Sequence, residues 1–182
     1  MSFEDALQNL EKVLKHCVQD HISLSTEKCH MMMNVVVFGH FISSQGIQVD
    51  PSKIQVIENL PIPITQTEVR SFLGHAGYYR RFIKKNSKIA SPLFVLLMKN
   101  VEFKWTNLCQ EAFDALKHQL SIAPILRGPD WALPFHISTD ASDTAIGAVL
   151  GQQENHLPYA IYFISKNMTL LNLITRLLRR NF

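Results

Sequence analysis

Apolar residues recur every three or four positions in several parts of the chain, which predicts amphipathic helices. Two of these segments also carry start signals. Asp50 precedes Pro51 as an N-cap, and Thr65 with Glu68 forms a capping box. The predicted helices cover residues 3–18, about 51–60, about 65–77, about 87–99 and about 105–120.

Two groups of short β-rich runs lie between and after these helices. In residues 35–49 the runs are separated by a break at Gly39-His40 and by turn residues at 43–46, which predicts a hairpin. Residues 135–140, 145–150 and 159–164 predict three consecutive strands of an antiparallel meander. Since no helix is expected to cover it, this thin sheet should expose an edge and favour aggregation. The predicted fold class is α+β.

The composition is that of a globular protein. The 182 residues are 47% hydrophobic and 18% charged, which excludes a disordered tail, a coiled coil and a collagen-like repeat. The longest apolar run, residues 93–98, is far too short for a membrane span. The acidic start at residues 1–5 does not resemble a signal peptide. We therefore expect an intracellular protein, cytoplasmic or nuclear, that is not secreted and does not interact with membranes.

Charge is distributed very unevenly along the chain. Residues 60–100 carry a net +6, between segments of −3 (residues 1–59) and −4 (residues 101–160), and residues 161–182 carry +4. A basic segment between acidic ones predicts a surface that faces a polyanion. A solvated helix face is the alternative interpretation of the same charges.

The segment Val69–Ile83 resembles the Pol polyprotein of gypsy-type LTR retrotransposons, and its sequence is most similar to those of plant elements. Further matching motifs occur in the family's order, and the resemblance runs from residue 2 to about residue 168. These motifs are Glu27–His30, Phe38–His40, Gly46–Asp50, Phe103–Trp105, Cys109–Phe113, Ala123–Leu126, Pro129–Asp130 and Thr139–Asp143.

The resemblance implies a domain order. Residues 1–49 are similar to the end of a reverse transcriptase palm, with its helix and β-hairpin, and residues 50–100 to a small helical thumb. Residues 101–130 are similar to a connector. Residues 131–168 are similar to the first antiparallel strands of an RNase H-like domain, which is incomplete here.

The resemblance also implies an activity for the intact family, which is RNA-directed DNA polymerase with RNase H and uses Mg²⁺. The family's paired aspartates, which hold the polymerase metals, match a position before Met1, and no Asp-Asp pair occurs in this sequence. We therefore expect this chain to be catalytically incompetent alone and to bind no metal. The alternative function is a residual duplex-binding module.

The implied partner is an RNA/DNA hybrid or DNA duplex, with no small-molecule substrate. Gly39 and His40 match a hairpin that contacts the primer end, although a plain hairpin glycine is the alternative. Tyr79, with Tyr78, suits sugar or base contacts, and core packing is an equal alternative. Basic residues of the thumb suit phosphate contacts. These are Arg70, Arg80, Arg81, Lys84 and Lys85.

Asp140 matches the first metal-binding carboxylate of RNase H. One aspartate does not hold two metal ions, so Asp140 would bind Mg²⁺ only if the site were completed, for example by a split partner chain. Asp143 is expected to shape a turn. The family's catalytic-glutamate helix should follow, but residues 171–182 contain no acid.

A reading-frame change accounts for this ending. One permitted set of codons for residues 171–182 reads, in another frame, as Gln-Phe-Asn-Tyr-Thr-Thr-Thr-Glu-Lys-Glu-Phe, which resembles the missing segment. We therefore interpret residues 169–182 as a frameshifted tail, so the +4 of residues 161–182 needs no functional explanation.

Overall fold

The computed structural model describes residues 3–29, 34–142 and 145–168 of the chain. Contacts divide the chain into two compact units, Met1–Val35 and Val36–Phe182. The predicted tail at 169–182 and the role given to Asp143 lie outside the described residues. The first unit contains helix α1 (Phe3–Gln19), as its periodicity predicts, and a short 3₁₀ helix, η1 (Thr26–Lys28). No side chain of α1 is buried.

The first sheet has the strand order β1-β2-β3, with β1 at Val35–Val37, β2 at His40–Ser43 and β3 at Gly46–Val49. The sequence predicted a hairpin with a break at Gly39-His40. In the structure the turn is instead formed by Phe38 and Gly39, and His40 begins β2. Both turn residues have positive φ, +48° and +69°, the combination that matches the twist of two tightly connected strands.

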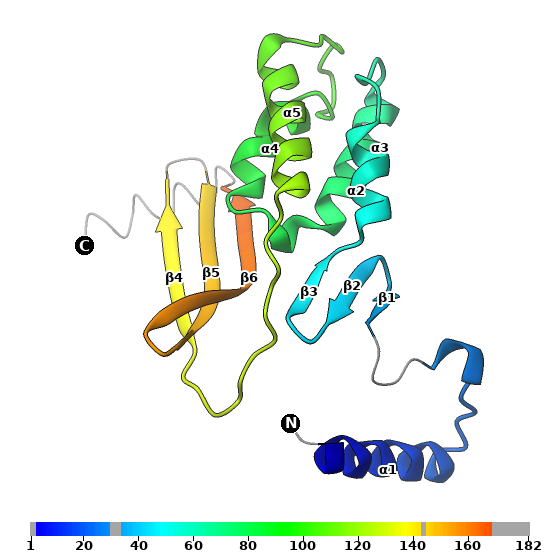
Figure 1. The fold of residues 1–182 in the computed structure, drawn as a ribbon. Coiled ribbons are helices and arrows are strands. Elements are labelled where there is room, and N and C mark those ends of the chain that lie inside the picture. Colours follow the sequence, from blue (N-terminus) through cyan, green and yellow to red (C-terminus); the bar gives the residue numbers. More distant parts are fainter. Residues whose placement is uncertain (1–2, 30–33, 143–144, 169–182) are drawn as a thin grey trace. The chain divides into compact units, whose positions relative to one another are not determined.

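The second unit continues with a helical bundle formed by α2 (Pro51–Glu58), α3 (Gln66–Tyr78), α4 (Asn86–Val95) and α5 (Asn107–Ser121), as Figure 1 shows. A 3₁₀ helix, η2 (Arg80–Phe82), connects α3 to α4. The predicted caps are present, because the Asp50 carboxylate accepts from the Ser52 N–H at 2.9 Å and the Thr65 hydroxyl from the Glu68 N–H at 3.2 Å.

Helix α4 is shorter than its predicted range of 87–99. After Val95 the backbone bonds change to the i→i+3 spacing, from Leu97 to Phe94 and from Met98 to Val95. Asn100 then adopts φ +66°, which an α-helix does not accommodate. The apolar run that suggested a longer helix therefore forms a turn.

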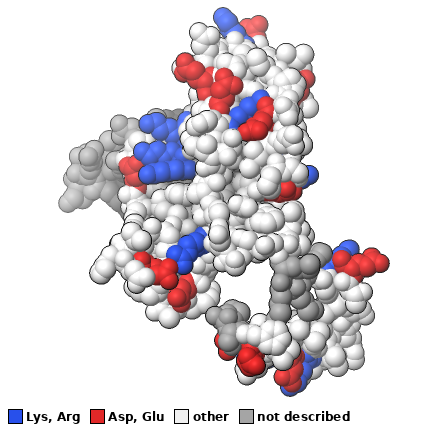
Figure 2. All heavy atoms as spheres, viewed as in Figure 1, with Lys and Arg blue, Asp and Glu red and all other residues white. Residues whose placement is uncertain are grey.

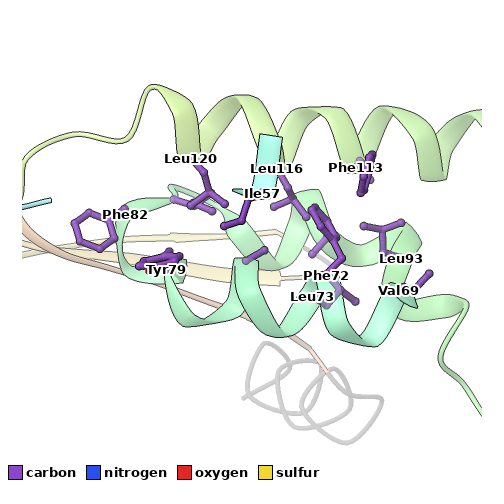
Figure 3. Packing of buried hydrophobic residues seen from close by; sticks show 14 of the residues in the cluster. Ile57, Val69, Phe72, Leu73, Tyr79, Phe82, Leu93, Phe113, Leu116 and Leu120 are labelled. Carbon is purple, nitrogen blue, oxygen red and sulfur yellow. The ribbon is translucent and has the colours of Figure 1, made fainter. Parts of the chain in front are cut away.

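The core lies between the helices of the bundle (Figure 3). The rings of Phe72 on α3 and Phe113 on α5 have their centroids 4.4 Å apart, and Leu116 is completely buried. Val49 of β3 and Leu126 of the following connection belong to the same buried cluster. The first sheet is therefore part of the bundle's core.

Close backbone packing connects β3 to residue 126. Ile47 and Leu126 exchange two backbone hydrogen bonds of 2.8 Å. Gly46 has φ +137°, and a Cβ at this position would lie 2.3 Å from the Leu126 carbonyl oxygen. Only glycine fits here without moving one of the two backbones.

The second sheet is the predicted antiparallel meander, in the order β4-β5-β6. Its strands are β4 (His136–Ala141), β5 (Ala145–Glu154) and β6 (Leu157–Asn167). The last two are longer than predicted because Asn155 and His156, at φ +51° and +63°, form a two-residue turn. The α+β class is confirmed.

The expectation that no helix covers this sheet is wrong. Strand β6 packs against α4 and η2, and Phe163 contacts the core of the bundle. The Ser87 N–H at the start of α4 donates to the Ser165 hydroxyl at 2.8 Å. At the other edge all six residues of β4 are exposed, so the predicted open edge is present there. None of the described helices is long and apolar enough to span a membrane.

Candidate nucleic-acid interface

The turn at Phe38-Gly39 is the first part of the candidate site. Two consecutive tyrosines at the end of α3 bond to it, with the Tyr78 hydroxyl donating to the Phe38 carbonyl and the Tyr79 hydroxyl donating to the Gly39 carbonyl at 3.0 Å. The Phe38 side chain is 87% exposed. The turn is therefore held firmly by its backbone while its apolar side chain points into solvent.

His40 fills the space behind this turn. Its ring lies 5.3 Å from Tyr78, 5.6 Å from Tyr79 and 5.8 Å from Phe82, measured between centroids, and its Nδ1 is 2.9 Å from the Phe38 carbonyl oxygen. Its Nε2 is buried and has no hydrogen-bond partner within the described residues. His40 thus supports the turn from inside, and we keep its direct contact with nucleic acid as a proposal.

The two tyrosines have different environments. Tyr79 is 4% exposed and belongs to the core cluster, whereas Tyr78 is 52% exposed. Burial, then the charges of Tyr78 and Asp50, raise the pKa of the Tyr79 hydroxyl, so it remains a protonated donor at neutral pH. Tyr79 therefore packs in the core, the alternative given above for the two tyrosines. Of the pair, only Tyr78 has an exposed ring that a ligand could contact.

The basic segment, which we define as Arg80, Arg81, Lys84, Lys85 and Lys88, follows the tyrosines directly. It bends sharply because Lys85 takes the left-handed conformation, φ +58°, before α4 begins. Arg80, Lys84, Lys85 and Lys88 are exposed. Figure 2 shows one larger group of Lys and Arg side chains at the left of the viewed face, with others scattered over it. Among the described residues, only Lys85 of this segment forms an ion pair.

Two of the residues predicted to contact phosphates, Arg81 and Arg70, differ from the exposed lysines of the basic segment in their surroundings. Arg81 is half-buried, and its guanidinium lies 5.1 Å from the centroid of the Tyr162 ring on β6, which connects the segment to the second sheet. Arg70 is exposed on α3, and it does not line the pocket described below that the lysines of the basic segment share. The sequence reasoning missed Lys88. Its position in the same basic run, three residues after Lys85, was the available signal.

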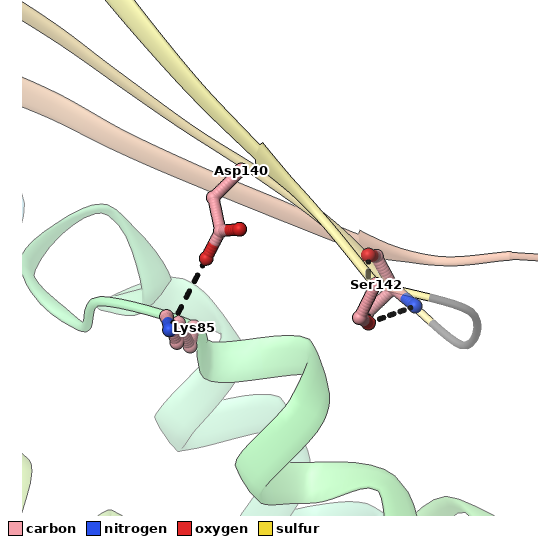
Figure 4. A network of polar contacts seen from close by, with 4 residues as sticks. Lys85, Asp140 and Ser142 are labelled. Carbon is pink, nitrogen blue, oxygen red and sulfur yellow. Dashed lines mark hydrogen bonds and ion pairs between the residues drawn. The ribbon is translucent and has the colours of Figure 1, made fainter.

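Asp140, a residue of β4, lies opposite the basic segment. Its carboxylate is 3.2 Å from the Lys85 ammonium, and both side chains are more than half exposed (Figure 4). Both residues line a pocket of about 210 Å³, together with Lys84 and Lys88. The structure thus brings together two residues that the sequence assigned to different sites, a phosphate-binding lysine and a metal-binding aspartate.

The donor set around Asp140 does not fit a two-metal site. Such a site needs several carboxylates that converge on the ions. Among residues 3–29, 34–142 and 145–168, no three His, Cys, Asp or Glu side chains are close enough to hold a metal ion together. The neighbour of Asp140 is a lysine, whose positive charge repels a metal cation.

A family described as "RNase H-like domain found in reverse transcriptase" matches residues 105–173. The match begins inside the predicted connector and includes α5 and the second sheet. The predicted domain limits themselves stay predictions.

Three curated relatives resemble most of the chain. The retrovirus-related Pol polyprotein from transposon 412 of Drosophila melanogaster is 40% identical over 164 residues, covering 90% of this chain and 13% of its own length. The transposon Tf2-3 polyprotein of Schizosaccharomyces pombe is 31% identical, covering 94% and 13%. An uncharacterized mitochondrial protein of Arabidopsis thaliana is 39% identical, covering 71% and 83%. The chain thus spans a small part of the two polyproteins.

Two solved structures share the fold. The foamy viral protease-reverse transcriptase in complex with dsDNA has a TM-score of 0.72 at 23% identity, over 99% of this chain and 39% of that one. The same protein in complex with an RNA/DNA hybrid has a TM-score of 0.71 at 22% identity, over 98% and 26%. At this identity the similarity establishes the fold alone.

Proposed function

Since the chain belongs to the Pol polyproteins of retrotransposons, we propose that it grips a nucleic-acid duplex, RNA/DNA hybrid or DNA, along the phosphate backbone. The observation that carries this proposal is the basic segment, whose cations are mostly exposed. It directly follows Tyr78 and Tyr79, which hold the Phe38-Gly39 turn. Lys85 excepted, its cations have no anionic partner among the described residues.

Phosphate contacts explain why the binding would be independent of sequence. Lys and Arg at a duplex release condensed counterions and fix its position, but they do not distinguish bases. Arg80, Lys84, Lys85 and Lys88 present such cations, and Arg70 adds one on α3. The foamy viral structures, which are complexes with duplex DNA and with an RNA/DNA hybrid, support the same class of ligand.

Catalysis is proposed to belong to the complete polyproteins. The sequence has no Asp-Asp pair, and the donors around Asp140 in the part of the chain that the structure describes do not fit two metal ions. We propose that Mg²⁺-dependent DNA synthesis and cleavage of the hybrid require residues that this chain does not supply. The assignment to gypsy-type and plant elements stays a prediction from the sequence.

A pair of fourfold variants tests the proposed binding. Changing Arg80, Arg81, Lys84 and Lys85 to Ala should weaken binding of a 20-base-pair RNA/DNA hybrid by about 100-fold at 0.1 M salt, as measured by fluorescence anisotropy. The control changes Lys12, Lys15, Lys99 and Lys104, all exposed, to Ala and removes the same charge elsewhere. Equal losses in both variants would contradict a specific duplex-binding surface.

A further inference from the structure

Four polar groups lie within hydrogen-bonding distance of the two backbone carbonyls of the Phe38-Gly39 turn. The Phe38 carbonyl accepts from the Tyr78 hydroxyl and lies 2.9 Å from Nδ1 of His40. The Gly39 carbonyl accepts from the Tyr79 hydroxyl at 3.0 Å and from the Asp50 N–H at 3.2 Å. Both carbonyls therefore have two neighbours that can donate, from residues next to the turn, the start of α2 and the end of α3.

This anchoring maintains an unfavourable arrangement. Phe38 has φ +48°, a conformation that costs energy for a residue with a Cβ, and its ring is 87% exposed. Neither feature stabilises the fold by burial. Persistent backbone strain of this kind is typical of sites where a side chain must be presented to a ligand.

Gly39 shows how closely the tyrosines fit. A Cβ added to Gly39, which has φ +69°, would lie 2.8 Å from the Tyr79 hydroxyl oxygen. The hydroxyl thus approaches a position that only glycine leaves open. Because Tyr79 directly precedes Arg80, the same residue that fixes the turn also fixes the start of the basic segment.

We infer that Tyr78 and Tyr79 are positioning residues, which hold the turn so that the Phe38 ring and the basic segment contact one nucleic-acid ligand together. This inference rests on the proposed function. An exposed aromatic ring packs on a base or sugar face, and a turn whose backbone is already held loses less entropy on binding. The two hydroxyls act on binding through the turn and do not contact the ligand themselves.

Removal of the hydroxyls tests this role with little change in shape. The double variant Tyr78→Phe/Tyr79→Phe should weaken hybrid binding by about tenfold, and Phe38→Ala should weaken it by about as much. Tyr159→Phe is the matched control, because it removes a hydroxyl that donates to Gln152 in the second sheet. The control should change binding less than twofold.

Combining the changes separates positioning from general loosening. In the Phe38→Ala background the two Tyr→Phe changes should have less than a twofold effect, since the ring that they position is gone. A full tenfold effect in that background would overturn the inference. So would unchanged binding by the double variant when the wild-type chain binds the hybrid.

A different experimental outcome is expected if the proposed function itself, and not only this inference, is wrong. In that case the fourfold variant of the basic segment and its charge-matched control would bind equally. An NMR readout is independent of binding. The Gly39 and His40 amide signals should broaden or shift in the double Tyr→Phe variant, and signals that stay sharp and unmoved would overturn the inference.

Discussion

The helical bundle and the second sheet are both amphipathic by sequence, yet they are stabilised in different ways. The buried cluster consists of bundle residues together with Val49 and Leu126. In the second sheet the only buried residues among those described are Ala145 and Gln152. The bundle contains a core of its own, whereas the sheet depends on the bundle and on a few polar contacts. The cations proposed to bind nucleic acid belong to the better-packed part.

The largest expected difference concerns core packing. Leu116→Ala removes a completely buried side chain from α5 and should lower the free energy of unfolding by about 2–5 kcal/mol. Ile137→Ala on β4, where the side chain is 71% exposed, should cost less than about 0.5 kcal/mol. Urea unfolding measures both. Similar losses at the two positions would contradict the contrast between bundle and sheet.

Gln152 should have an intermediate effect, because it is the buried polar residue of the sheet. Its amide group bonds to the Asp130 N–H and carbonyl, the Leu133 carbonyl and the Tyr159 hydroxyl, at 2.7–2.9 Å. Gln152→Ala leaves these groups unpaired and should cost about 2 kcal/mol.

Its neighbour Gln153 is exposed and provides the control, with an expected cost near zero. If thermal unfolding of the two variants coincides, the polar contacts of Gln152 do not hold the 130–133 connection to the sheet.

The smallest effect is expected at Lys85 and Asp140. Both side chains are more than half exposed, so solvent screens their ion pair, and Asp140→Asn should change stability by less than about 0.5 kcal/mol. The same variant should bind the hybrid no more weakly than wild type, because it releases Lys85 for a phosphate. Weaker binding in anisotropy measurements would show that Asp140 takes part in the site.

Periodicity and capping signals were sufficient to predict the helices and the meander. Asp50, Thr65 and the spacing of Leu116 and Leu120 act locally, so their consequences can be read from neighbouring residues. The Phe38-Gly39 turn was misplaced because positive φ at Phe38 depends on hydrogen bonds from Tyr78 and Tyr79, forty residues away in the sequence.

Contacts between residues distant in sequence also limited the prediction of the candidate site. The basic segment is contiguous, so its charge was visible in the sequence. Its contact with Asp140 joins positions more than fifty residues apart and depends on β6 packing against α4. No local pattern indicates that packing, and the sheet was therefore expected to have no covering helix.

The dependence of duplex affinity on salt tests the central claim most directly. If the basic segment binds phosphates, the logarithm of the association constant for duplex DNA should fall linearly with the logarithm of salt concentration, with a slope of about −4. The fourfold variant at Arg80, Arg81, Lys84 and Lys85 should reduce that slope to about −2, the contribution of the remaining Lys88 and Arg70. A wild-type affinity that does not change between 50 and about 200 mM salt would contradict the account.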